Sequence, residues 1–426
     1  MDTLKKAALT LVDPTSAGFD AARLARIDAH FRPYVDDGRL PGWQVLVSRA
    51  GNVVHLSSYG QRDKEAGLPV EADTIFRIYS MTKPITSVAA MMLFEEGAFE
   101  LMTPVSRFIP SFADARVYVR GSAQKPLTVP VAEPVRIWHL LTHTAGLTYG
   151  FHHGHAVDEA YRAAGYEWSW PDGTDLAAAC DTWARLPLAF EPGTEWNYSV
   201  ATDVLGRVVE VASGQSLDTF FAERILKPLG MEDTRFSVLE ADRNRLAALY
   251  AVAPGIPAPI RYDLMGDVAL TRPSLLSGGG GLVSTIADYH RFTQLLLGHG
   301  ELDGVRLLAP GTLELMGQNH LPGGLDLEAV GRPLFAETTF NGVGFGLGFS
   351  VLIDPAAAKT LGNRGEIAWG GAASTAFWVD PVDEVVAIFM TQLLPSSTHP
   401  IRSELRQLVY QALIGGGTSP LSAVLA

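Results

Sequence analysis

The sequence predicts an α/β (α+β) fold in which both ends of the chain build one antiparallel sheet flanked by helices. Strand-like patterns occur early, at 44–48 and 53–57. Between the early and late strands the patterns are mostly helical and broken by Gly/Pro loops, which indicates a helical insertion in the sheet. The strand patterns return only near the end of the chain, at 345–353, 366–375 and 385–391.

The remaining elements follow in chain order. Residues 20–36 carry Leu24, Ile27 and Phe31 at helical spacing and predict a helix before the first strand. Residues 401–414 predict a final amphipathic helix. With 426 residues, 47% of them hydrophobic, the chain is long enough for two lobes. We predict a sheet domain at 1–75 and 336–426, a mostly helical domain at 76–335, and an active site between them.

Composition excludes several classes of partner. The net charge is −13 and no basic patch occurs, which argues against nucleic acid and anionic membranes. No apolar run reaches the length of about 18 residues that a membrane-spanning helix needs. The apolar run at 7–12 is too short for a signal-peptide core, so the chain is expected to be cytoplasmic. The single Cys180 excludes an internal disulfide and is expected to be a small core residue of a helix.

The sequence around Ser80 and Lys83 indicates nucleophilic chemistry. The two residues are three positions apart at the start of a strongly apolar helix that Gly97 ends, so they share one face. Apolar neighbours and the positive end of the helix dipole both disfavour a charged amine at Lys83. A neutral amine beside a hydroxyl is a general base beside a nucleophile. Pro84 is tolerated because it lies in the first turn.

A serine three residues before a lysine also has simpler explanations. Ser122 and Lys125 repeat the spacing in a segment with loop punctuation, which leaves that serine without a rigid support. Ser80 alone is also compatible with a helix cap beside a solvated lysine, although its apolar neighbours leave little solvent. No Gly-x-Ser-x-Gly elbow occurs anywhere in the chain.

Two further segments carry possible chemistry. Tyr198 follows a Pro-Gly turn and precedes an apolar helix, where its hydroxyl is able to relay protons, although an ordinary half-buried tyrosine fits as well. Gly370 and Gly371 interrupt a predicted strand after Trp369, which marks either a close backbone approach to a ligand or a β-bulge. Just past them, the backbone N–H of Ala372 is able to donate a hydrogen bond to an oxyanion.

A metal centre is not expected. His139 and His143 are four residues apart, but no Glu follows His139 as a zincin requires. The second histidine cluster, 152–155, lies in a Gly-rich loop. The glycine run at 277–281 lacks the Lys-Ser/Thr of a phosphate loop and predicts a close backbone approach before a helix.

The order Ser80-x-x-Lys83, Tyr198 and Trp369-Gly-Gly resembles the serine β-lactamase and penicillin-binding-protein superfamily. It is most similar to the family VIII carboxylesterases, which share the class C β-lactamase fold. The segments 138–147, 225–234 and 277–285 also match this family, so the resemblance runs from about residue 20 to 414. The resemblance implies that His139 and His143 are structural.

The resemblance also assigns roles residue by residue. Ser80 matches the nucleophile, Lys83 the base that activates it, and Tyr198 the proton relay to the leaving group and the deacylating water. The backbone N–H groups of Ser80 and Ala372 match the oxyanion hole. Tyr149 and the Trp369-Gly370-Gly371 segment are assigned to the substrate pocket. No metal or cofactor takes part, and the expected partner is a small-molecule ester.

Departures from the family pattern bear on the substrate. Members that recognise penicillins carry Lys-Thr-Gly where this chain has Trp369-Gly370-Gly371, and Tyr-x-Asn where it has Tyr198-Ser-Val200. Without that cation and that amide, the pocket favours small uncharged esters. A serine carboxylesterase is therefore predicted. An acyltransferase of the same fold, a β-lactamase or D-alanyl peptidase, and a non-catalytic binding protein remain open alternatives.

Overall fold

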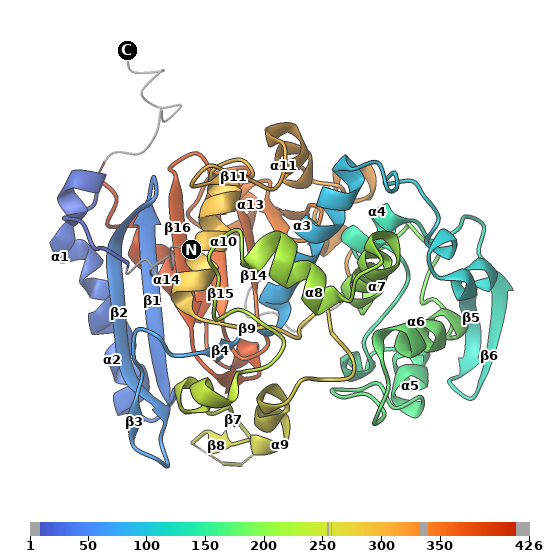
Figure 1. Ribbon diagram of the computed structural model, residues 1–426, viewed down its shortest axis with the longest axis horizontal. Helices are drawn as coiled ribbons and strands as arrows, with labels where there is room; N and C mark the ends of the chain where they lie inside the picture. The colour runs from blue at the N-terminus through green and yellow to red at the C-terminus, as the bar shows by residue number, and fades with distance from the viewer. Residues whose placement is uncertain (1–8, 254, 257, 333–339, 415–426) are drawn as a thin grey trace.

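The computed structural model describes residues 9–253, 255–256, 258–332 and 340–414. An eight-stranded antiparallel sheet dominates it and joins the two ends of the chain, because β1 and β16 are hydrogen-bonded neighbours (Figure 1). This architecture confirms the predicted fold class. The strand order is β12 (Val343–Phe345), β13 (Ser350–Leu352), β14 (Ile367–Gly370), β15 (Ala376–Asp380), β16 (Val385–Met390), β1 (Gly42–Arg49), β2 (Asn52–Asp63) and β3 (Leu68–Pro69).

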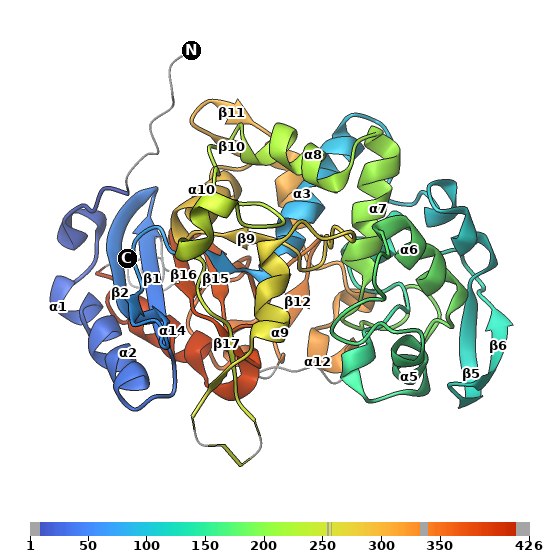
Figure 2. The same cartoon turned by 60° about the horizontal axis from the view of Figure 1, so that its bottom comes forward.

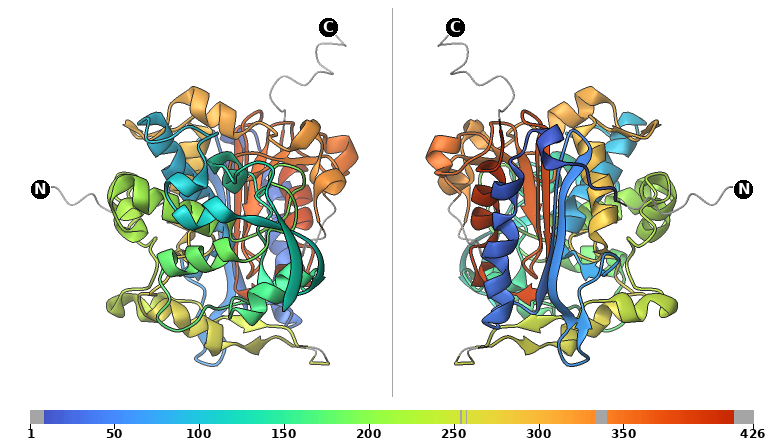
Figure 3. Two further views of the ribbon diagram at one scale, coloured as in Figure 1. Left: turned by 90° about the vertical axis from the view of Figure 1, so that its right-hand side faces the viewer. Right: turned by 90° about the vertical axis from the view of Figure 1, so that its left-hand side faces the viewer.

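Alternation along the strands separates two cores. In β1, Val45 and Val47 point into one core while Leu46 points into the other. The first core lies under α1 (Ala21–Leu24), α2 (Arg26–Asp36) and α14 (Ile401–Tyr410), which cover the outer face of the sheet. The opposite face is covered by α10 (Ile286–Leu297), a helix from the middle of the chain (Figure 3).

The helical part of the molecule extends away from the sheet beyond α10 (Figure 2). Its longest members, α3 and α7, pack against each other near the sheet. The helices are α3 (Thr82–Glu95), α4 (Ile137–Leu141), α5 (Ala156–Ala163), α6 (Leu176–Arg185), α7 (Ala201–Ser213), α8 (Leu217–Phe221), α9 (Asp263–Gly266), α11 (Pro310–Met316), α12 (Leu327–Val330) and α13 (Pro355–Ala358).

Short strands complete the molecule. The hairpin of β5 and β6 projects at the far end of the helical part, and its turn holds Ser122 and Lys125. None of the helices in the described ranges is long and apolar enough to cross a membrane. The short strands are β4 (Phe76–Arg77), β5 (Arg116–Ser122), β6 (Lys125–Pro130), β7 (Tyr250–Ala251), β8 (Ile260–Arg261), β9 (Val283–Ser284), β10 (Glu301–Leu302), β11 (Val305–Arg306) and β17 (Leu393–Leu394).

Two of the predicted late strands differ from the structure. The segment 345–353 is divided between β12 and β13, because the chain turns at Gly346, where an added Cβ would lie 2.1 Å from the carbonyl oxygen of Met316. The segment 366–375 holds only β14 and a turn, and the strand β15 that follows it was not predicted. Ser374 has φ = 66° in that turn, a conformation that a strand does not adopt.

Candidate active site

Ser80 lies in a single turn of 3₁₀ helix, Tyr79–Met81, that leads directly into α3. The residue before it, Tyr79, has φ = 42°, a strained conformation for a non-glycine residue. The turn leaves Ser80 half-exposed, whereas the first twelve residues of α3 are all buried. The serine is thus presented at the end of a rigid, fully packed helix.

Lys83 occupies the second position of α3 and is only 1% exposed. Its Nζ lies 3.2 Å from Ser80 Oγ, 3.1 Å from the hydroxyl of Tyr149 and 2.7 Å from the carbonyl oxygen of Gly279. Within the described ranges, no carboxylate forms an ion pair with this amine. A buried amine with three oxygen neighbours and no paired acid is suited to exchange a proton with the serine.

Asp203, on the first turn of α7, supports the lysine from behind. Its Oδ1 accepts hydrogen bonds from Ser277 Oγ at 2.5 Å and from the N–H of Gly279 at 3.0 Å. Gly279 in turn offers its carbonyl oxygen to Lys83, so the carboxylate fixes the loop that holds the amine. Burial raises the pKa of Asp203, and the nearby positive charge of Lys83 opposes that shift.

Asp203 and Gly279 were missed by sequence reasoning about the site. Nothing in the local pattern sets Asp203 apart from other polar residues of a first helical turn. Gly279 belongs to the glycine run that predicted a close backbone approach, and the structure shows such an approach: an added Cβ there would lie 2.5 Å from Asp203 Oδ2. The group that lies against Gly279 is Asp203, and the sequence alone did not indicate this pairing.

Tyr198 lies just before α7 and is 8% exposed. Its ring centroid is 4.4 Å from the Nζ of Lys83, and its hydroxyl accepts a hydrogen bond of 3.3 Å from the indole N–H of Trp369. Two aromatic neighbours, His143 and Tyr149, hold the ring in place at centroid distances of 5.0 and 5.3 Å. The structure thus brings Tyr198 and Trp369 together beside the lysine.

Tyr149, assigned to the pocket by the sequence, lies closer to the chemistry than expected. Its hydroxyl is within hydrogen-bond distance of Lys83 Nζ. Burial first, and then the negative charge of Asp203, raises the pKa of Tyr149 well above its ordinary value, so the hydroxyl stays protonated at neutral pH. Two tyrosines therefore flank the amine.

The Trp369-Gly370-Gly371 segment ends β14 beside the serine turn. An added Cβ on Gly371 would lie 2.5 Å from the carbonyl oxygen of Ile78, so only glycine allows this approach. On the preceding glycine, Gly370, a Cβ would lie 2.3 Å from the guanidinium of Arg402. The two glycines therefore fit against the protein itself, and Ala372, which follows them, lines the same cavity as Ser80.

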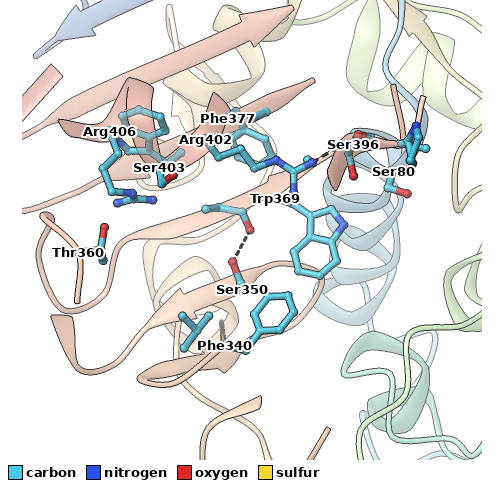
Figure 4. Close-up of a pocket in the computed structure, with 18 of the residues that line it drawn as sticks. Ser80, Phe340, Ser350, Thr360, Trp369, Phe377, Ser396, Arg402, Ser403 and Arg406 are labelled. Carbon is cyan, nitrogen blue, oxygen red and sulfur yellow. Dashed lines mark hydrogen bonds between the residues drawn. The ribbon is translucent and has the colours of Figure 1, made fainter. Parts of the chain in front are cut away.

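A cavity of about 1050 Å³ opens in front of these groups (Figure 4). Ser80, Tyr198 and the segment 369–372 line one part of it. Figure 4 shows the ring of Trp369 between Ser80 and Phe340, with the guanidinium of Arg402 close to that ring and Arg406 farther along the sheet. Volumes of 300–1,000 Å³ are typical of sites for drug-sized ligands, so this cavity is large for its class.

His139 and His143 lie in the protein interior. His143 is 1% exposed, contacts Ser199 and packs on Tyr198, and burial lowers its pKa well below the ordinary value. His139 Nδ1 accepts the N–H of Arg136. In the described ranges no group of three His, Cys, Asp or Glu side chains is arranged to hold a metal ion. Cys180 is fully buried in α6, as predicted.

The fold and the serine–lysine pair together define a class, the serine hydrolases of the β-lactamase-like fold. The model of the family described as Beta-lactamase matches residues 27–411, and the chain belongs to that family. Esterase EstB of Burkholderia gladioli is 34% identical to this chain over 426 residues, covering 94% of the chain and 98% of the relative. Protein Rv1367c of Mycobacterium tuberculosis is 37% identical over 373 residues, covering 86% and 89%.

A solved structure adds to the comparison. EstCE1, described as a hydrolase with promiscuous acyltransferase activity, superposes with a TM-score of 0.77 at 29% identity and covers 92% of this chain and 99% of its own. These relatives confirm the predicted resemblance to the family VIII carboxylesterases and the predicted enzyme class, a serine hydrolase.

Proposed function

We propose that this protein is a serine carboxylesterase that hydrolyses uncharged esters of short acyl groups through an acyl-enzyme on Ser80. One observation carries the proposal: the buried amine of Lys83 lies 3.2 Å from the hydroxyl oxygen of Ser80, and no carboxylate in the described ranges forms an ion pair with it. The names of EstB and EstCE1 support the class of reaction.

The first step is transfer of the Ser80 proton to Lys83. The carbonyl oxygen of Gly279 only accepts hydrogen bonds, so one N–H of the amine is committed to it. In the neutral amine the lone pair is then free to face Ser80 Oγ. As the proton moves, Oγ attacks the ester carbonyl carbon, and the carbonyl oxygen takes up the negative charge of the tetrahedral intermediate.

The oxyanion is assigned to the backbone N–H groups of Ser80 and Ala372. The close approach of Gly371 to Ile78 supports this assignment, because it brings the end of β14 beside the serine turn. Removing a donor of this kind typically costs about 3–4 kcal/mol of transition-state stabilisation. Both donors belong to the backbone and therefore need no reorganisation when charge develops.

Collapse of the intermediate breaks the ester C–O bond and requires a proton for the leaving alcohol. Tyr198 is assigned this role, because its ring packs beside Lys83 and its hydroxyl contacts Trp369 in the cavity wall. This leaves Tyr198 as a phenolate. In the second half-reaction the phenolate is assigned to take a proton from the water that attacks the acyl-enzyme, and Lys83 returns its proton to Ser80 as the serine C–O bond breaks. Tyr149, bonded to Lys83, keeps the amine oriented through both steps.

Trp369 supports uncharged substrates. Its indole stands in the cavity wall beside Tyr198, at the sequence position where penicillin-recognising members carry a lysine. An indole offers apolar surface and one N–H donor and does not pair with a carboxylate. A nitrocefin assay tests the β-lactamase alternative, for which we expect slow turnover at most.

Acyl transfer to an alcohol is a second candidate. EstCE1 is described as having promiscuous acyltransferase activity, and the cavity is large enough for an acyl group and a second alcohol. The two reactions share the acyl-enzyme and differ only in whether water or an alcohol attacks it. Adding an alcohol and measuring ester product against free acid separates them.

The test uses p-nitrophenyl acetate and intact mass after labelling with a fluorophosphonate. We expect a single adduct on the wild type and none on Ser80→Ala, with turnover reduced by about 10⁴-fold or more. Ser122→Ala is the matched control, because Ser122 has the same spacing to a lysine but lies in the exposed turn between β5 and β6. Labelling of Ser80→Ala, or loss of labelling in Ser122→Ala alone, would overturn the assignment.

A further inference from the structure

The cavity in front of Ser80 has an aromatic side wall that the proposed chemistry does not use. Tyr149, Phe151 and Trp168 form a continuous stack, with ring centroids 4.6 Å and then 4.2 Å apart and interplanar angles of 18° and 13°. The inner ring, Tyr149, bonds Lys83, while Phe151 and Trp168 line the cavity. The stack therefore runs from the catalytic amine outward along the cavity.

The outer ring is unusually exposed for its size. Trp168 is 46% exposed, although an indole is among the most apolar surfaces a side chain offers. In the described part of the chain, Phe151 is the one ring in contact with Trp168. An exposed indole at the end of a stack, in the wall of a cavity, offers a ligand an aromatic surface on which to pack.

This side of the cavity is also without charge. Among the described lining residues, the charged ones belong to the segments 359–366 and 402–406 near α14. Arg402 donates to the carbonyl oxygens of Gly371 and Thr375, and Arg406 pairs with Glu366, so their charges are directed at the protein. Among the lining residues that the structure describes, an ionic group on the ligand therefore finds no charged partner in the segment 151–168.

We infer that the wall of Phe151 and Trp168, which Tyr149 supports from behind, is a binding subsite for a planar aromatic group on the substrate, which makes aryl-bearing uncharged esters the preferred class. The inference rests on the proposed function and specifies its substrate. A cavity of about 1050 Å³ greatly exceeds the needs of a short acyl group, so the volume is available to the alcohol part of the ester. Packing between aromatic rings favours a planar π-surface over a saturated ring of the same size.

The test compares two esters that differ in planarity. They are 2-naphthylmethyl acetate and (decahydronaphthalen-2-yl)methyl acetate, which share the acyl group and have primary alcohols as leaving groups. For the full-length wild type we expect kcat/KM to be about 3- to 10-fold higher for the planar ester. Trp168→Leu keeps an apolar side chain but removes the π-surface. It should lower that ratio towards one by raising KM for the planar ester alone.

Trp170→Leu is the matched control, because Trp170 packs against the main core and does not line the cavity. Its ratio should equal that of the wild type. Equal kcat/KM for the two esters in the wild type, or an unchanged ratio in Trp168→Leu, would overturn the aromatic subsite while leaving the esterase intact. Failure of the wild type to hydrolyse either ester or p-nitrophenyl acetate would overturn the proposed function itself.

Discussion

The amine of Lys83 is held by groups from three separate segments of the chain. Ser80 lies one turn earlier, Tyr149 comes from the loop after α4, and Gly279 comes from the glycine run before β9. Asp203 fixes the last of these through the N–H of Gly279. At the residue scale, we therefore expect the reactivity of the serine to depend on a buried carboxylate that acts through Gly279.

Replacing Asp203 with asparagine tests that dependence. The amide oxygen of Asp203→Asn still accepts the N–H of Gly279, so the loop is expected to keep its place, but the negative charge near Lys83 is lost. Because that charge favours the protonated amine that forms when Lys83 takes up the serine proton, we expect the acidic limb of kcat/KM against pH to move to lower pH.

Ser277→Ala is the control for this experiment, because it removes a hydrogen bond to Asp203 without changing the charge. Its pH profile should keep the wild-type midpoint. A profile of Asp203→Asn that coincides with the wild type would show that the carboxylate has only a structural role.

At the scale of secondary-structure elements, the end of β14 is expected to set the geometry of the proposed oxyanion hole. Trp369 faces the cavity, Gly370 fits under Arg402, and Gly371 lies against Ile78 of the serine turn. Backbone spacing at this point sets the distance between two proposed oxyanion donors on segments almost 300 residues apart. The element therefore acts through the position of its backbone more than through its side chains.

Gly371→Ala is expected to separate these two segments. The new Cβ would lie 2.5 Å from the carbonyl oxygen of Ile78 and 2.3 Å from Thr375 Oγ1. Either the end of β14 or the segment before Ser80 must therefore shift. Displacement of about 1 Å in a catalytic group costs on the order of 100-fold, and we expect a loss of kcat of that size. Gly311→Ala is the control, since a Cβ there meets nothing within 4 Å.

Thermal unfolding of the two variants provides the second readout for this element. Gly311→Ala should keep the activity and should not lower the melting temperature, because alanine favours the helix at this open position. Full activity in Gly371→Ala would show that the close approach of β14 to the serine turn is not needed for catalysis.

At the scale of the whole molecule, buried histidines connect the sheet to the helices that cover it. His290 on α10 contacts Ser48 of β1 at 2.8 Å, and His139 and His143 lie in the interior of the helical part. Burial lowers the pKa of His139 and of His290 to about 4, and that of His143 well below 6.5. All three are neutral in the folded protein near neutral pH.

The sign of the pH dependence follows from these shifts. The unfolded chain binds protons on these histidines at a higher pH than the folded chain, so the unfolding free energy is greatest above about pH 6.5 and falls as the pH drops towards 4. We expect the melting temperature to fall over this range. His290→Gln should show a shallower fall, because one of the groups no longer titrates.

The exposed His299 offers the control, as His299→Asn, since asparagine tolerates its left-handed conformation at φ = 53°. That variant should follow the wild-type pH dependence. Equal slopes for the wild type and His290→Gln between pH 6.5 and 4 would contradict the assignment to His290.

Much of the architecture was readable from the chain because it depends on local patterns. The apolar strand patterns at 44–48 and 385–391, and the apolar helical pattern after Lys83 that Gly97 ends, are set by neighbouring residues, and the structure has β1, β16 and α3 at these places. The pairing of Ser80 with Lys83 depends on a helical spacing of three and was predicted on the same ground. The division of the chain by residue number into two domains stays a prediction, and α10, from the predicted insertion, packs on the sheet.

Tertiary structure alone decided the rest. Three contacts join residues that are tens to hundreds of positions apart: Lys83 with the carbonyl oxygen of Gly279, Gly279 with Asp203, and Phe151 with Trp168. No local pattern encodes which segments meet. The same holds for the turn that ends β14, where the space beside each glycine is set by Ile78 and Arg402. The sequence by itself determined the fold class and the spacing that brings Ser80 beside Lys83, because both follow from short-range patterns. The shape of the cavity, and with it the substrate, depends on long-range packing.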